Sequence, residues 1–197
     1  MLIVVRHGRT AANASGLLLG RRLDPGLDDL GQRQAAAVAE VLAGAARIVS
    51  SPLRRARETA EAIGPPVTVD DRWAEVDYGV LDGTPMAEVG PEVWARWRSD
   101  LDHAPQGGES IRALGARIRP ACEDLVAEAA DHDVVVVSHV SPVKAAVAWA
   151  LGVGDGVAWR MWCAPASITR IAVGPRGPSL HGYNDVSHLV GLEPERR

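Results

Sequence analysis

The sequence predicts an α/β protein, a three-layer α/β/α fold around a mostly parallel central sheet. The first observation is a pair of unbroken apolar runs, Leu2-Ile3-Val4-Val5 and Val134-Val135-Val136-Val137, typical of strands that are buried on both faces. The second is that segments with helical apolar spacing, such as Ile111, Leu114 and Ile118, alternate with these runs. The third is a length of 197 residues with no linker that would divide the chain.

We therefore expect one domain over residues 1–197, with a small cap at about residues 76–108. The cap segment is interrupted by prolines and carries Trp94 and Trp97 on a short helix after Pro91. These tryptophans favour a packing role over the sheet edge.

Composition excludes several classes of partner and compartment. The net charge of -4 and the pI of about 5.9 argue against a general affinity for nucleic acid or for anionic membranes. The apolar start is too short for a signal sequence, and no stretch reaches the length of a membrane span. Cys122 and Cys163 are far apart and form no CxxC, so we expect reduced core thiols in a cytoplasmic protein.

The first predicted helix starts at Asp28 or Asp29, either of which can cap it, and ends before Gly44. A short strand follows at residues 47–49. The next helix is expected to have Ser51 as its N-cap and Pro52 at its first helical position.

Another short strand is expected at residues 67–69, and a long amphipathic helix from Ile111 through Leu125. After the valine-rich strand, a helix is predicted from Ser141-Pro142 through Leu151. Residues 167–173 and 179–184 are expected to close the sheet as two further strands.

Two strands of the predicted sheet end in the same way. The first runs into Arg6-His7-Gly8, and the valine-rich strand runs into Ser138-His139. Ligands of such sheets bind outside the carboxyl ends of the strands, so both histidines should reach one edge. Arg-His-Gly alone would be a weak signal, because a surface arginine and a turn histidine are common.

Cations gather near this edge. Arg9, Arg21 and Arg22 follow Arg6 closely, and Arg54 and Arg55 lie in the first turn of a predicted helix. The free amides and dipole of a helix N-terminus favour anions, so the pattern suggests a phosphate or carboxylate ligand. A solvated basic loop is the alternative for the arginines at 9, 21 and 22.

Six segments, in order along the chain, carry a more specific signal. They are LIVVRHGRTAAN, GLDDLGQRQA, SSPLRRARETA, WAEVDYGVLDG, QGGES and VVVVSHV. Each segment is similar to a motif of the histidine phosphatase superfamily. In the same order, these motifs are strand-RHGET-x-x-N, L-T-x-x-G-x-x-Q-A, S-S-x-L-x-R-A-x-x-T-A, E-x-x-x-G-x-x-E-G, G-G-E-S and V-V-S-H-G. The chain thus resembles that phosphoglycerate mutase-like family over nearly its whole length, and its HVSPVK segment resembles some of the acid phosphatases within it.

The resemblance implies a role for each matching residue. His7 would be the nucleophile that becomes phosphorylated, with Arg6, Arg55 and His139 around the phosphoryl group. Glu75 would protonate the leaving oxygen. The positions implied to bind the substrate are Asn13, Gly20, Arg21 and Val140.

The chemistry agrees with these roles. A neutral imidazole is a competent nucleophile near its reference pKa of about 6.5, and fixed cations stabilise the equatorial oxygens of a transferring phosphoryl group. This scheme needs no metal and no cofactor.

Three departures from the family pattern leave questions open. Arg9 replaces the glutamate of RHGET, and it either adds charge to the mouth, where it would help choose the substrate, or points outwards. Val140 replaces a glycine, which leaves the backbone amide but puts a side chain near the pocket. Asp77 is a second candidate for the proton donor beside Glu75.

The sequence therefore predicts a metal-independent phosphomonoester hydrolase that acts on a small phosphorylated metabolite through a phosphohistidine. A phosphoglycerate mutase-type transferase is the alternative within the same chemistry, although the chain is shorter than such mutases and has a reduced cap. A non-catalytic phosphometabolite-binding module and a metal-dependent hydrolase built on His7, His139 and Glu75 are alternatives of other classes. The substrate stays open, and the family implies a possible homodimer.

Overall fold

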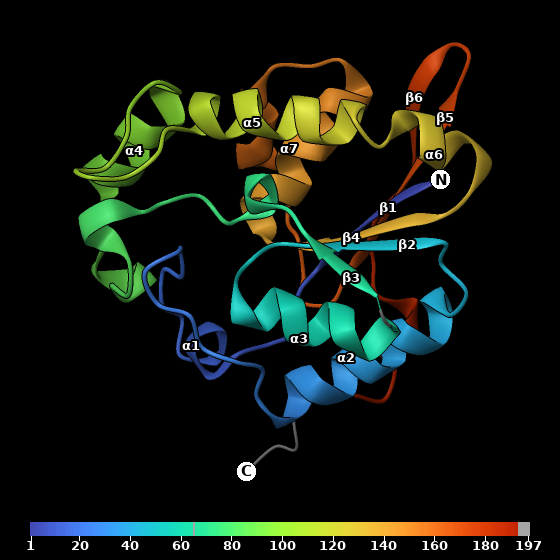
Figure 1. The fold of residues 1–197 in the computed structure, drawn as a ribbon. Helices are drawn as coiled ribbons and strands as arrows, with labels where there is room; N and C mark the ends of the chain where they lie inside the picture. Colours follow the sequence, from blue (N-terminus) through green and yellow to red (C-terminus); the bar gives the residue numbers. More distant parts are fainter. Residues whose placement is uncertain (65, 193–197) are drawn as a thin grey trace.

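The computed structural model describes residues 1–64 and 66–192; residue 65 and residues 193–197 of the predicted domain lie outside the described part. Its centre is a six-stranded sheet in the order β3-β2-β4-β1-β5-β6 (Figure 1). The strands are β1 (Leu2–Arg6), β2 (Arg47–Ser50), β3 (Val67–Val69), β4 (Val134–Ser138), β5 (Ile168–Gly174) and β6 (Gly177–Asp185).

The sheet is mostly parallel, as predicted. β1, β4, β2 and β3 run in one direction, whereas β5 lies antiparallel to β1 and β6 antiparallel to β5. Arg6 pairs with Ser138, so β1 and β4 end level with each other. The residues that follow both strands, His7 and His139, therefore leave the sheet at the same edge.

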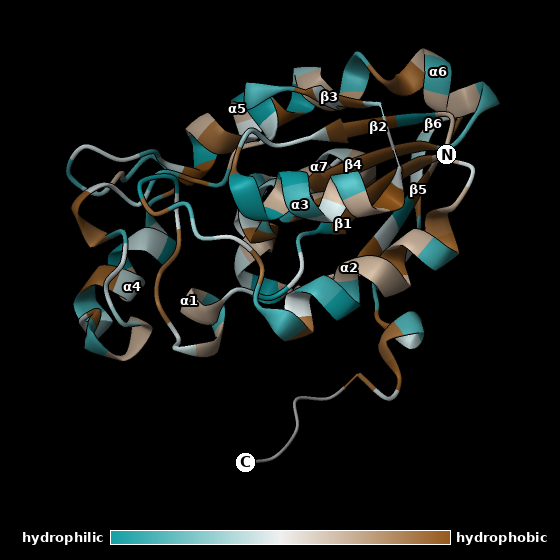
Figure 2. Ribbon diagram, turned by 60° about the horizontal axis from the view of Figure 1, so that its bottom comes forward, coloured by the Kyte–Doolittle hydropathy of each residue, from teal (hydrophilic) through white to brown (hydrophobic). Residues whose placement is uncertain are grey.

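Helices cover both faces of the sheet, which confirms the three-layer fold (Figures 1 and 2). α5 (Ile111–Glu123) and α7 (Val140–Leu151) pack on one face, where Leu2 and Val4 point. α2 (Asp29–Leu42) and α3 (Arg54–Ile63) pack on the other, against Ile3 and Val5. Alternate residues of one continuous apolar strand thus serve two separate cores, which is why the run contains no polar residue. The short α6 (Val126–Asp131) precedes β4.

The start of α2 agrees with the sequence and the start of α3 does not. Asp28 caps α2, because its carboxylate accepts the Gly31 amide at 2.8 Å. Ser51 is not the cap of α3, which begins at Arg54 with Leu53 as N-cap. The Ser51 amide donates to Val137 at 3.0 Å, so Ser51 still follows the sheet, and the proline after it disfavours helical backbone.

The predicted cap, residues 76–108, begins in the core at the buried Val76 and contains α4 (Pro91–Ser99). Both figures place α4 and the short α1 (Ala11–Ala14) at the end of the molecule opposite the N-terminus (Figures 1 and 2). Trp97 is buried there in a small apolar cluster, with Trp94 and Trp159 around it at ring distances of 5.7 and 6.2 Å. This satellite core holds α4 beside the carboxyl edge of the sheet.

Two predictions about the chain as a whole can be compared with the fold. Cys122 and Cys163 are buried free cysteines, as expected. Within residues 1–64 and 66–192, no helix has the length and apolar content to cross a membrane.

Candidate active site

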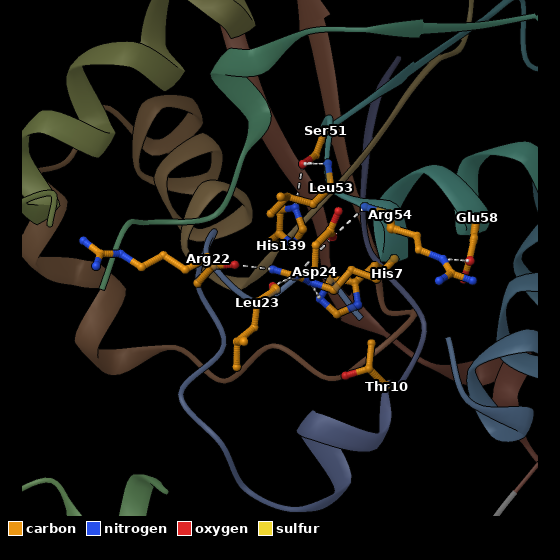
Figure 3. Close-up of polar contacts among 12 residues, drawn as sticks. His7, Thr10, Arg22, Leu23, Asp24, Ser51, Leu53, Arg54, Glu58 and His139 are labelled. Atoms are coloured by element: carbon orange, nitrogen blue, oxygen red, sulfur yellow. Dashed lines mark hydrogen bonds and ion pairs between the residues drawn. The ribbon is translucent and has the colours of Figure 1, made fainter. Parts of the chain in front are cut away.

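His7 and His139 lie side by side at the edge where β1 and β4 end (Figure 3). Their ring centroids are 5.0 Å apart, and both side chains are buried. The sheet register alone produces this pairing, because the two strands end level and each histidine is the next residue.

The hydrogen bonds of His7 fix the position of its proton. Its Nδ1 lies 2.7 Å from the carbonyl oxygen of Gly8, which can only accept, so Nδ1 carries the hydrogen. Burial, followed by the charges of Arg55 and Arg6, holds the pKa of His7 well below 6.5. The ring is therefore neutral at ordinary pH, with a lone pair on Nε2, 3.3 Å from the Arg55 Nε.

His139 is oriented by Ser51, whose hydroxyl oxygen lies 2.7 Å from His139 Nε2. The same oxygen accepts the Leu53 amide at 3.3 Å, which favours donation of the hydroxyl hydrogen to the ring (Figure 3). Burial, followed by the charge of Arg55, holds the pKa of His139 well below 6.5. The ring hydrogen then sits on Nδ1, a buried atom that no described residue hydrogen-bonds. Such a donor is available to an oxygen atom of a ligand.

Two guanidinium groups flank His7, and both are held by carbonyl oxygens. Arg6 Nη1 donates to Cys163 at 2.7 Å, and its Nε is a buried donor without a partner among the described residues. Arg55 is completely buried and donates to the carbonyl of Gly20 at 2.8 Å. The only carboxylate of the described chain within 4.0 Å of its guanidinium is the exposed Asp24, at 3.8 Å, and Glu75 acts on Arg55 from farther away. Carbonyl anchors fix these cations without neutralising them, so the charge stays available to an anion.

Arg54 and Arg55 are adjacent in sequence and have opposite surroundings. Arg54 is 64% exposed and pairs with Glu58 one turn along α3 at 2.6 Å (Figure 3). Arg55 points inwards to His7. The structure thus places Arg55, rather than Arg54, beside the two histidines.

Glu75 is a buried carboxylate at the same edge of the sheet. Its Oε1 accepts the amides of Val76 at 2.7 Å and of Ser141, at the start of α7, at 3.2 Å. Asp77 instead accepts the Gly79 amide and lies 3.7 Å from Arg22, away from the cavity described next. The geometry favours Glu75 over Asp77 as the acid that a bound ligand would meet.

A cavity of about 390 Å³ opens in front of these groups. Five of the predicted site residues line it, namely Arg6, His7, Asn13, Glu75 and Val140. Its remaining wall is largely apolar and comes mainly from Leu17, Leu18, Leu19, Tyr78, Met86, Trp94, Trp162 and Pro165. A neutral nucleophilic imidazole, fixed cations and a buried acid at the bottom of one small cavity suit transfer of a phosphoryl group.

The model of the histidine phosphatase superfamily (branch 1) matches residues 2–186. The chain belongs to this family. It is 40% identical over 167 residues to a glucosyl-3-phosphoglycerate phosphatase of Mycolicibacterium vanbaalenii, covering 77% of this chain and 74% of that protein. It is 34% identical over 198 residues to phosphoserine phosphatase 1 of Hydrogenobacter thermophilus, covering 95% and 93%.

Solved structures of histidine phosphatases agree with the fold. A mycobacterial glucosyl-3-phosphoglycerate phosphatase in complex with VO3 has a TM-score of 0.82 at 35% identity, covering 93% of this chain and 98% of that one. Phosphoserine phosphatase of Entamoeba histolytica, in complex with 3-phosphoglyceric acid, has a TM-score of 0.87 at 27% identity, covering 95% and 98%. This histidine phosphatase chain spans about half the length of other curated relatives. One is a bifunctional protein of Mycobacterium tuberculosis; the two are 38% identical over 178 residues, and the match covers 49% of that protein.

Two residues of this histidine phosphatase that were predicted to bind the substrate, Gly20 and Arg21, are not among those that line the cavity. Each instead makes a hydrogen bond to another residue of the site. Gly20 donates its amide to Asp82 at 2.9 Å, while its carbonyl holds Arg55. Arg21 donates to the backbone oxygen of Glu75 and pairs with Glu109 at 2.7 Å. Both positions therefore support the arginine and the acid of the site.

Arg9 and Asn13 do line the cavity, each with one polar group already engaged. Arg9 Nε pairs with Asp28 at 2.8 Å. Asn13 Oδ1 accepts the Thr10 amide at 3.1 Å in a reciprocal capping box, which leaves the NH₂ of its amide as its free donor.

Sequence reasoning missed three residues of the site. Ser51 was assigned to a helix cap and instead contacts His139. Trp162, which is 73% exposed at the cavity, was not singled out, and no local pattern marks it. Lys144, the only lysine of the chain, also lines the cavity, and the HVSPVK motif that contains it does not mark it as a site residue.

A metal-dependent hydrolase built on His7, His139 and Glu75 would need these side chains to gather around one metal ion. Across the described residues, no three His, Cys, Asp or Glu side chains gather as a metal site would require. Independence from metal stays a prediction, and loss of activity in EDTA would contradict it.

Proposed function

We propose that the protein is a metal-independent phosphatase that hydrolyses phosphomonoesters of small metabolites through a phosphohistidine at His7. The observation that carries this proposal is the state of His7. Its Nε2 keeps a lone pair in a buried site between two guanidinium groups, because Nδ1 is committed to Gly8 and the pKa is lowered. A nucleophile with cations fixed around it is what in-line attack on phosphorus requires.

In the first step, His7 Nε2 forms a bond to phosphorus while the bond to the ester oxygen breaks. Arg6, Arg55 and the Nδ1–H of His139 face the equatorial oxygens, where charge accumulates. Glu75, in its protonated form, gives its hydrogen to the leaving oxygen, which departs as an alcohol.

In the second step, a water molecule attacks phosphorus and Glu75, now ionised, accepts a proton from it. The bond between phosphorus and His7 breaks, inorganic phosphate leaves, and His7 regains its lone pair. Each group returns to its starting state, so no cofactor is consumed.

The relatives favour hydrolysis over a mutase reaction. Their names include phosphatases of glucosyl-3-phosphoglycerate and phosphoserine, at 40% and 34% identity, beside a probable phosphoglycerate mutase of Yersinia enterocolitica at 31%. An acid phosphatase fits the lowered pKa of His7, which keeps the nucleophile unprotonated in mildly acidic solution. We also propose a cytoplasmic location, consistent with two buried, unpaired cysteines, and a small phosphorylated substrate as the partner.

Rapid-quench experiments with p-nitrophenyl phosphate test the mechanism. We expect an alkali-stable phosphoryl group on His7 and a burst of p-nitrophenol in the full protein. His7→Asn should lose both the burst and turnover, whereas EDTA should change neither. Undiminished turnover in His7→Asn would overturn the proposal.

A further inference from the structure

The chain contains a single lysine, Lys144, beside 20 arginines. It lies on α7, four residues after Val140, so both side chains project from the same face of the helix. Both residues line the main cavity and also a smaller cavity formed by Tyr78, Trp94 and Trp97. The one lysine of the protein is thus placed between the phosphoryl-transfer site and the aromatic cluster beside α4.

Lys144 has no internal partner in the described part of the chain. Within residues 1–64 and 66–192, no carboxylate lies within 4.0 Å of its ammonium group and no side-chain hydrogen bond is made by it. Arg9 is the other cation of the cavity wall that does not flank the two histidines, and it is paired with Asp28. Of these two cations, only Lys144 has no ion-pair partner among the described residues.

An unpaired ammonium in this position is costly. Lys144 is partly buried, and burial lowers its pKa against the opposing influence of Cys163 and Glu75. Its neighbours in the cavity wall include Val140, Trp94 and Tyr78. Desolvating a charge without a counter-charge is unfavourable, and an anionic ligand would remove that penalty.

We propose that Lys144 binds a carboxylate on the organic part of the substrate, so that the enzyme acts on small phosphorylated carboxylic acids. This rests on the proposed phosphatase function. A phosphoryl group in the proposed reaction is met by Arg6 and His7, which line the cavity, and by Arg55 and His139 directly beside His7. A lysine is a compact point charge that suits a single carboxylate, whereas a second phosphate calls for the several donors of arginine forks. Lys144 lines the same cavity as Arg6 and His7, so the two anions belong to one small molecule.

A pair of substrates that differ only in this group tests the proposal. 3-Phosphoglycerate carries a carboxylate where glycerol 3-phosphate has a hydroxymethyl group. We expect the enzyme to favour 3-phosphoglycerate in kcat/KM by about tenfold or more, the size of one charge-assisted hydrogen bond. Lys144→Met keeps the length of the side chain and should abolish that preference, mainly through KM. Arg57→Met, which removes an exposed cation paired on the surface of α3, is the matched control and should keep it.

The outcomes separate the two proposals. Absence of turnover on p-nitrophenyl phosphate would refute the phosphatase function, and this inference with it. Turnover without a preference, or equal losses on both substrates in Lys144→Met, would refute the role of Lys144 alone. Equal losses would assign the lysine to the phosphoryl group.

A second measurement does not depend on the variant folding. Reductive methylation with ¹³C-formaldehyde keeps the charge of lysine and labels Lys144 and the amino terminus, the only amines of the chain. In His7→Asn protein, which should not turn over, the Lys144 signal should shift with 3-phosphoglycerate much more than with glycerol 3-phosphate. Equal shifts, or none, would overturn the proposal.

Discussion

At the residue scale, Ser51 decides which nitrogen of His139 carries the hydrogen. We expect Ser51→Ala to lower kcat by about tenfold, since one hydrogen bond that orients a phosphate donor is lost. Ser51→Thr, which keeps the hydroxyl, should recover most of the activity. ¹⁵N spectra of His139 provide the structural readout, because the Nδ1–H tautomer should dominate in the parent protein and not in Ser51→Ala. Unchanged tautomer populations would contradict this role.

Glu75 and Asp77 can be distinguished by the leaving group. Glu75→Gln should lower kcat on an alkyl phosphate by about 10² to 10⁴, because the departing alkoxide loses its proton donor. The loss on p-nitrophenyl phosphate should be much smaller, since nitrophenolate leaves without protonation. Asp77→Asn serves as the matched control, because Asp77 is outside the cavity lining and accepts a backbone amide instead. A larger leaving-group effect in Asp77→Asn would reverse the assignment.

The site could be predicted from sequence where a residue's position follows from strand ends or from a family motif. His7 and His139 follow strands that must end together, and Arg55 follows from its motif. Ser51 and Lys144 could not be placed in this way, because their roles depend on contacts across the fold. Ser51 meets a residue 88 positions away, and Lys144 shares its cavity with Glu75, which comes from a distant part of the chain. Gly20 and Arg21 show the opposite case, since their positions match the family while their polar groups hold Arg55 and Glu75.

At the scale of elements, two glycines hold the loop after β1 against the first turn of α2. A Cβ on Gly31 would overlap the carbonyl oxygen of Arg9, and a Cβ on Gly8 would meet the carbonyl of Gly31. Gln34, also on α2, accepts the Arg9 amide at 2.8 Å. This close approach explains the spacing of Gly31 and Gln34 in the GLDDLGQRQA segment. Through these contacts, α2 supports the loop that carries His7.

Gly31→Ala tests this contact, because helix propensity and packing predict opposite signs. Alanine is better than glycine inside a helix by about 1 kcal/mol, so propensity alone would stabilise the variant. We expect instead a loss of about 1–3 kcal/mol in the free energy of unfolding, because the backbones must separate. Gly154→Ala is the control, since its Cβ would meet nothing within 4 Å. Urea unfolding of both variants gives the comparison, and a stabilised Gly31→Ala would disprove the close approach.

Element boundaries followed the sequence where a local signal set them. Asp28 caps α2 and Pro91 opens α4 because side-chain and φ preferences act within a few residues. The start of α3 moved from Pro52 to Arg54 because β2 continues its pairing through Ser51. Because β4 lies far along the chain, the local Ser-Pro sequence could not predict that pairing.

At the scale of the whole molecule, the buried site should make stability depend on pH. The folded-state pKa values of His7 and His139 lie well below 6.5, mainly because both rings are desolvated. Between those values and 6.5 the unfolded chain binds more protons than the folded protein, so acidification favours unfolding. Stability should therefore be constant above about pH 7 and decrease as pH falls through 6.5, by up to about 1.4 kcal/mol per pH unit for each histidine.

Urea unfolding in phosphate-free buffers between pH 7.5 and 5.5 measures this slope, because bound phosphate would supply a counter-charge and hide it. A double variant that combines His7→Gln with His139→Gln should show a flatter dependence of the free energy of unfolding on pH over the same range. An equal slope in the two proteins would mean that the pKa values of the histidines are not lowered in the folded state. His7 would then be protonated in mildly acidic solution and would lack the lone pair required for attack on phosphorus, so this measurement on the folded protein bears directly on the proposed chemistry.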